Sequence, residues 1–353
     1  MTARLLPKKD LPGFIAALAK KQEVWAPVRI QSQEAARFSR IDRPEDICLD
    51  YLNTKLPVKE LFFPQREVMF TFNPGERSSA QASAQVRERV VLGVRPCDAA
   101  ALELFDKVFV DESKTASPLA ESKTAGPLAD PYYKERRDKT TLIGLACNAP
   151  GQACFCTATD GGPHSTRGLD LLLIDLGDRF LARPVTAKGE ALAKGLARAK
   201  DKDISLADEL AEEARATMDF AIELKQLQKS LDKAFDHEVW HRLSLPCVNC
   251  GVCTYVCPAC HCFDVTDEEY KDSGARIRTW DSCQFSLFTR HASGHNPRPD
   301  GMSRMRNRTL HKFCYFPKTQ DKVLCVGCGR CITECPAGID LRETLETLRD
   351  TLS

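Results

Sequence analysis

Two cysteine runs with the same spacing constrain this chain more than any other feature. The two runs are Cys247, Cys250, Cys253 and Cys257, and Cys325, Cys328, Cys331 and Cys335. Each run follows the pattern C-x2-C-x2-C-x3-C-P, which is typical of ferredoxins that hold two 4Fe-4S clusters. In such domains three thiolates of a run bind one cluster and the fourth thiolate binds the other. We therefore predict two 4Fe-4S clusters in one small C-terminal domain.

Each predicted ligand set combines three cysteines of one run with the fourth cysteine of the other run. The first cluster is assigned to Cys247, Cys250, Cys253 and Cys335. The second cluster is assigned to Cys325, Cys328, Cys331 and Cys257. The alternative is a pair of structural zinc sites, but these usually combine two separated C-x2-C pairs or include histidine. The spacing favours iron–sulfur clusters, which give or take one electron at a time.

The segment between the two runs, 258–324, is a long insert with its own cysteines and basic residues. Its cysteines are Cys260, Cys262, Cys283 and Cys314. The alternatives are further metal ligands or small buried residues; because their spacing matches no common cluster motif, we favour the second. Its basic residues from 280 to 318 are Arg290, Arg298, Arg304, Arg306, Arg308, Lys312 and Lys318. These residues either dock an acidic partner or raise the cluster potentials; the equal alternative is that they hydrogen-bond within the insert and cap the clusters.

The charge balance and the apolar pattern exclude several classes of protein. Lysine and arginine total 50 against 49 aspartates and glutamates, which predicts binding to neither nucleic acid nor a membrane surface. The apolar stretch 11–19 is broken by Pro12 and Gly13 and is too short for a signal peptide or a spanning helix. Clustered cysteines in such a chain indicate metal binding rather than disulfides. We expect a cytoplasmic protein without a membrane span.

The N-terminal segment 1–186 is predicted to form an α/β domain. Short aliphatic runs at 89–94, 141–146 and 171–176 have the length and composition of buried strands. The segments 14–21 and 99–109 are predicted to be helices. Mixed strands and helices of this kind fit an α/β domain better than an all-β one.

The rest of the chain divides by composition into a connector and the cysteine-rich region. The segment 187–242 is rich in Ala, Leu, Lys and Glu, which predicts a helical connector. The segment 243–353 is predicted to be an α+β, bacterial-type two-cluster ferredoxin domain that contains the insert. A tandem repeat of nine residues at 112–120 and 121–129 indicates a duplicated surface loop.

Four further cysteines lie in the N-terminal segment. Cys97 follows the predicted strand 89–94, Cys147 follows the strand 141–146, and Cys154 and Cys156 come a few residues later. Residues just beyond parallel strands gather at one edge of a sheet, where such sheets bind ligands. The hypothesis is a third iron–sulfur cluster bound by these four cysteines. The alternative is that they are structural or redox-inert.

Several longer motifs resemble one family. They are VRPCD at 94–98, CFCT at 154–157, LLLIDLGDRFL at 171–181, RTWDSC at 278–283 and ASGHNPR at 292–298. With these motifs the chain resembles the beta-subunit family of soluble NiFe sulfhydrogenases, and the anaerobic sulfite reductase A subunits are similar. The resemblance implies a cytoplasmic complex in which this subunit relays electrons. The resemblance implies two redox partners for this subunit. One would be a flavin-containing subunit linked to NAD(P) or ferredoxin, and the other would be the catalytic subunit of a hydrogenase or a sulfite reductase.

Three functions remain open at this stage. The leading interpretation is a non-catalytic electron-transfer subunit, with iron bound through the cysteines named above and no catalytic residue. A stand-alone reductase would need a substrate site in the N-terminal domain. We find no dinucleotide-binding fingerprint, phosphate loop or nucleophile elbow there. A zinc-stabilised adaptor would join two proteins without electron transfer.

Overall fold

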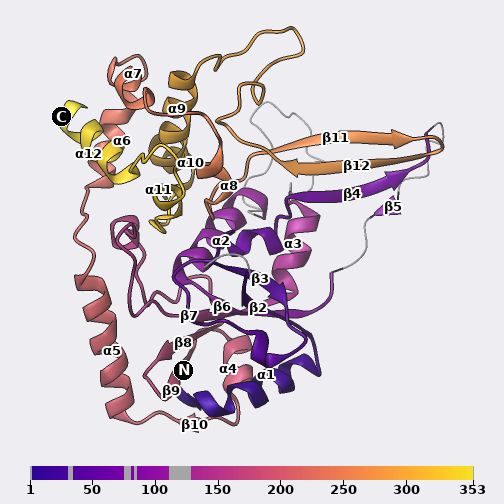
Figure 1. The fold of residues 1–353 in the computed structure, drawn as a ribbon, viewed down its shortest axis with the longest axis vertical. Coiled ribbons are helices and arrows are strands. Elements are labelled where there is room, and N and C mark those ends of the chain that lie inside the picture. Colours follow the sequence, from indigo (N-terminus) through magenta and orange to yellow (C-terminus); the bar gives the residue numbers. More distant parts are fainter. Residues whose placement is uncertain (1, 31–34, 75–80, 83–85, 111–128, 353) are drawn as a thin grey trace, which may run out of the picture. The chain divides into compact units, whose positions relative to one another are not determined.

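The computed structural model describes residues 2–30, 35–74, 81–82, 86–110 and 129–352 (Figure 1). The chain forms two compact units. The first comprises Met1–Phe63 and Val86–Asp219, and the second comprises Pro64–Gln85 and Phe220–Ser353. The predicted loop at 112–129 lies outside the described residues except for Ala129. The expected division into 1–186, 187–242 and 243–353 stays a prediction about domain boundaries.

The first unit is built on an eight-stranded mixed sheet. Its strands are β1 (Arg4–Pro7), β2 (Glu23–Arg29), β3 (Ala36–Arg40), β6 (Arg89–Val94), β7 (Thr140–Leu145), β8 (Leu171–Asp175), β9 (Arg179–Pro184) and β10 (Ala197–Arg198). They are ordered β10-β1-β9-β8-β7-β6-β2-β3. The neighbours β2, β6, β7 and β8 are parallel, and the outer pairs are antiparallel. Every residue of β6 is buried, as its unbroken aliphatic run predicts.

The predicted strands of this unit are confirmed, with bounds shifted by one residue at most. Its helices are α1 (Leu11–Ala19), α2 (Pro96–Phe109), α3 (Pro131–Asp138), α4 (Ala187–Ala193) and α5 (Asp201–Ala216). The helix predicted at 14–21 begins earlier, because Pro12 lies in the first turn, where a missing N–H costs nothing. The helix predicted at 99–109 begins at Pro96 for the same reason. The helical content expected in 187–242 is confirmed, with the short strand β10 as an addition.

The second unit combines a small sheet with short helices. Its strands are β4 (Arg66–Phe72), β5 (Gln81–Ala82), β11 (Phe263–Tyr270) and β12 (Ser273–Trp280). All of them pair antiparallel in the order β11-β12-β4-β5. Figure 1 shows the long hairpin of β11 and β12 lying along β4. The insert between the two cysteine runs therefore supplies two strands of this sheet, and a segment near residue 70 supplies the others.

The rest of the second unit is mainly helical, and two motif cysteines, Cys253 and Cys331, lie in its short helices. The helices are α6 (Leu224–Asp232), α7 (Val239–Ser244), α8 (Val252–Tyr255), α9 (Gly301–Leu310), the π-helix η5 (His311–Tyr315), α10 (Phe316–Gln320), α11 (Arg330–Thr333) and α12 (Leu341–Leu352). Trp240, Phe313 and Leu345 are fully buried among them. None of the helices within the described residues combines the length and apolar composition that crossing a bilayer requires.

Candidate metal centre

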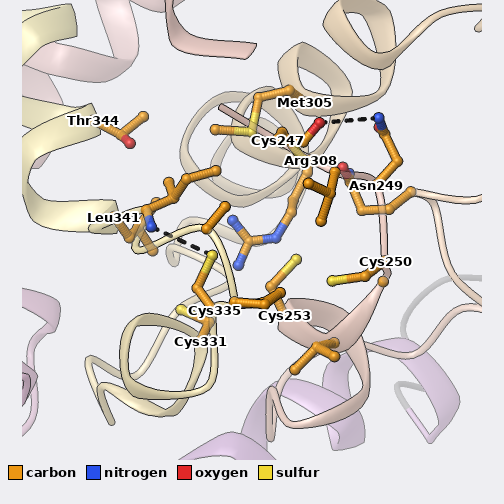
Figure 2. Close-up of a pocket in the computed structure, with 17 residues that line it drawn as sticks. Cys247, Asn249, Cys250, Cys253, Met305, Arg308, Cys331, Cys335, Leu341 and Thr344 are labelled. Atoms are coloured by element: carbon orange, nitrogen blue, oxygen red, sulfur yellow. Dashed lines mark hydrogen bonds between the residues drawn. The ribbon is translucent and has the colours of Figure 1, made fainter. Parts of the chain in front are cut away.

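One cavity in the second unit brings cysteines of both runs together. Cys247, Cys250 and Cys253 of the first run line it together with Cys335 of the second (Figure 2). Cys331 also lines this cavity. The four cysteines predicted as the first ligand set thus line one cavity together with Cys331 of the predicted second set, and the assignment of ligands to each cluster stays a prediction.

The backbone bends in the same way in both runs. Gly251 has φ +76° and precedes α8, which carries Cys253. Gly329 has φ +75° and precedes α11, which carries Cys331. Glycine adopts this left-handed conformation without steric cost. A Cβ atom at Gly251 would also lie 2.6 Å from the ring of Phe285. The loop that carries the first run is therefore closed around a glycine that cannot be replaced without a shift.

The second predicted ligand set lies in a more buried part of the unit. Cys257, Cys325 and Cys328 are buried, and Cys331 is half-buried. Burial raises the pKa of Cys325 to about 11, and the thiols of Cys257 and Cys331 add to this increase while Lys312 opposes it. Cys257, Cys325 and Cys331 are thus close enough to influence one another.

One thiol of the first set, that of Cys253, is also affected by burial. Burial raises the pKa of Cys253 to about 11, against the positive charge of Arg308. Metal ligation by cysteine requires the thiolate, so iron binding at these positions displaces protons.

Two cations of the insert point at these cysteines. Lys312 is 2 % exposed, and its Nζ lies 3.4 Å from the Sγ of Cys257. Arg308 is 6 % exposed and lines the cavity of the first set. In Figure 2 its guanidinium points into the cavity toward Cys253 and Cys335. Within the described residues, Nε and Nη2 of Arg308 have no hydrogen-bond partner.

This arrangement fits a 4Fe-4S cluster in the cavity. Thiolates are the ligands of such clusters, and hydrogen bonds to sulfur are a usual part of their surroundings. A buried guanidinium with unsatisfied N–H groups is costly unless an anion faces it. A cluster held by four thiolates would supply that negative charge and the sulfur acceptors.

Three insert cysteines have other cysteines as hydrogen-bond partners. The buried Cys260 is hydrogen-bonded to the thiol of Cys257. A hydrogen bond from Cys262 is the main cause that lowers the pKa of Cys283 to about 6. Cys314 has different surroundings, with its Sγ 4.0 Å from a carboxylate oxygen of Asp232. Their interpretation as structural residues stays a prediction.

The N-terminal cysteines lie at one edge of the eight-stranded sheet. Cys97 is in the first turn of α2, directly after β6, and Cys147 follows β7, the parallel neighbour of β6. Arg95 ties the two loops together, because its Nη1 donates to the carbonyl oxygens of Leu145 (3.3 Å) and Ala146 (2.9 Å).

Cys154 and Cys156 lie close to Cys147. Burial raises the pKa of Cys156 to about 12, and the thiols of Cys147 and Cys154 contribute to the increase. Three of the four cysteines thus influence one another, and Cys97 lies at the same sheet edge. Across the described ranges, no three histidine, cysteine, aspartate or glutamate side chains are arranged to hold a single metal ion.

The basic composition of the insert does not distinguish Arg308 and Lys312, which lie against the cysteines, from the other basic residues. The signal in the sequence was their spacing of four residues, which places two side chains on one helical face. Their direction toward the cysteines depends on the fold and could not be read from that spacing.

Comparison with known proteins agrees with the site. Residues 246–339 match the family model of a 4Fe-4S dicluster domain. The chain is 30 % identical over 352 residues to sulfhydrogenase 2 subunit beta of Pyrococcus furiosus, and the match covers 98 % of each chain. The family predicted from the sequence motifs is thereby confirmed. A ferredoxin-type iron–sulfur domain is joined to an α/β unit in this chain, which belongs to the family of sulfhydrogenase beta subunits.

Proposed function

We propose that this chain is the electron-transfer subunit of a cytoplasmic oxidoreductase complex. It relays single electrons between a flavin-containing subunit and a catalytic partner. The observation that carries the proposal is the cavity in which Cys335 joins Cys247, Cys250 and Cys253. A domain in which two runs exchange their fourth ligand keeps two clusters close together.

The proposed ligands are the eight motif cysteines in the crossed sets given above. A 4Fe-4S cluster supplies one-electron redox chemistry when it is bound. Burial of Cys257, Cys325 and Cys328 keeps water away from the second set. Cys250 is exposed, so the first set has one ligand at the surface of the unit. We therefore propose that electrons pass between the domain and a partner on the side of Cys250.

We further propose a third iron–sulfur cluster at Cys97, Cys147, Cys154 and Cys156. The mutual influence of three of these thiols and the tie made by Arg95 support it. Replacement of Cys154 and Cys156 together by serine is expected to remove about four irons per chain, the content of one 4Fe-4S cluster. Unchanged iron in that variant would mean that these cysteines are structural.

The partners are proposed from the family. The relative from Pyrococcus furiosus is the beta subunit of a sulfhydrogenase, so that enzyme has further subunits. For this chain we propose a flavin subunit linked to NAD(P) or ferredoxin, and a hydrogenase or sulfite reductase catalytic subunit. Nucleic acid is not a proposed partner, because the charges of the chain nearly cancel.

An anaerobic pull-down with the tagged chain tests the relay. The expected result is co-purification of a flavoprotein and of hydrogen- or sulfite-dependent activity, with a visible absorption that bleaches when the partner's substrate is added. Turnover by the chain alone would instead indicate a stand-alone reductase. Zinc without acid-labile sulfide would indicate the adaptor.

A further inference from the structure

Two cations of one helical segment reach the two predicted ligand sets. Arg308 lies in α9 and Lys312 lies in η5, which continues α9 without a break. Residues four apart lie on the same face of a helix. Both side chains are almost completely buried, which is rare for charged residues unless an opposite charge faces them.

Lys312 is fixed against the second set by three contacts. Its Nζ donates to the carbonyl oxygen of Leu324 at 2.8 Å, directly before Cys325, and lies 3.4 Å from the Sγ of Cys257. Its own carbonyl oxygen accepts from the N–H of Leu324 at 2.9 Å. The segment is a π-helix at this point, and such irregular turns are frequent at functional sites. The ammonium therefore has one defined position between two predicted ligands.

Arg308 faces the first set, and no carboxylate of the described residues pairs with it. Its guanidinium points into the cavity lined by Cys247, Cys253 and Cys335 (Figure 2). Burial lowers the pKa of the Arg308 guanidinium, but nearby cysteines, first Cys253 of the first set and then Cys331 of the second, raise it above its usual range. Burial likewise lowers the pKa of Lys312, and the nearby cysteines Cys257, Cys260 and Cys325 raise it above its usual range.

Other basic residues of the insert have partners away from the cysteines. Arg306 donates to the carbonyl oxygen of Phe235 at 3.0 Å, and its guanidinium lies 3.8 Å from the centre of that ring. Arg304 donates to the carbonyl oxygens of Arg298 and Pro299. Lys318 pairs with Asp232. Arg308 and Lys312 thus differ from these neighbouring basic residues because they lie against cysteines.

We propose that Arg308 and Lys312 set the reduction potentials of the two clusters, Arg308 acting on the first set and Lys312 on the second. The proposal rests on the proposed function, because it requires clusters bound by the motif cysteines. Reduction adds one negative charge to a cluster. A buried positive charge and an N–H donor beside the thiolates stabilise that added charge more strongly than they would in water. Each residue therefore raises the potential of the cluster that it faces.

The test is a potentiometric titration of the anaerobically purified full chain, followed by electron paramagnetic resonance. The variants are Arg308→Gln and Lys312→Gln. Each is expected to make reduction of one cluster at least about tenfold less favourable, a shift of about 59 mV to lower potential for one electron. The cluster affected should differ between the two variants. Arg306→Gln, on the same helix but facing Phe235, is the matched control and should leave both potentials unchanged.

Charge-preserving variants separate electrostatics from structural damage. Arg308→Lys and Lys312→Arg retain the positive charge, so both are expected to keep potentials near those of the unmodified chain. If a glutamine variant loses iron, the potential is measured in its charge-preserving counterpart instead. A tenfold shift of the reduction equilibrium in that counterpart overturns the proposal. Intact clusters with unshifted potentials in both glutamine variants also overturn it. A chain without iron and sulfide before any substitution would overturn the proposed function instead.

Discussion

The ion pair between Arg278 and Glu67 provides the sharpest prediction about stability. Arg278 lies on β12 and Glu67 on β4, and both side chains are 3 % exposed. The Nε of Arg278 lies 3.1 Å from Oε2 of Glu67. Replacing Arg278 by methionine leaves a buried carboxylate without its cation. Breaking a buried pair in this way costs about 3–5 kcal/mol of unfolding free energy.

A matched control lies two residues away on the same strand. Arg276 pairs with Asp267 through two hydrogen bonds, but both side chains are well exposed. Exposed pairs contribute little, since water and salt screen them. Arg276→Met is therefore expected to cost only a small fraction of the loss in Arg278→Met. The double variant Glu67→Leu with Arg278→Met should recover most of the stability, because it removes both buried charges.

Urea unfolding of the full anaerobic chain measures these differences. Trp240 and Trp280 both belong to the second unit and report its unfolding by fluorescence. Equal destabilisation by Arg278→Met and Arg276→Met would refute the reasoning. Failure of the double variant to recover stability would also refute it.

The remaining predictions concern the cysteine loop and a helix cap. Gly251→Ala should cost more than about 1 kcal/mol and reduce iron content, because Gly251 has φ +76° and faces Phe285. Gly13→Ala, in α1 with nothing within 4 Å of the new Cβ, should instead stabilise by about 0.5–1 kcal/mol; urea unfolding and iron analysis compare the two. Asp130→Ala should destabilise the first unit by about 1 kcal/mol, because the Asp130 carboxylate accepts from the N–H groups of Tyr132 and Tyr133. Asp130→Asn keeps an acceptor at this position and should lose much less, and equal losses would contradict a capping role.

The sequence predicted the parts of the structure that depend on local pattern. The strand at 89–94 was predicted because a short, largely aliphatic run of this length is typical of a buried strand. The repeated spacing also predicts that Cys335 lies near the first run, and Cys335 lines the same cavity as Cys247, Cys250 and Cys253.

The parts that depend on distant pairing could not be predicted. β12 pairs with β4, and their residues are about two hundred positions apart in the chain. The local sequence of β4 at 66–72, REVMFTF, does not predict which strand it pairs with. The same holds for Arg308 and Lys312. Their spacing places them on one face, but only the packing of α9 and η5 determines that this face is the one toward the cysteines.

The most direct test of the central claim is iron and acid-labile sulfide per chain in Cys335→Ala, compared with the unmodified chain. The crossed assignment predicts a loss of about four irons with a matching loss of sulfide, the content of one 4Fe-4S cluster. The control Cys314→Ala, whose thiol lies beside Asp232, should retain the full amount. Full iron in Cys335→Ala, or zinc in place of iron and sulfide in the unmodified chain, would contradict the account.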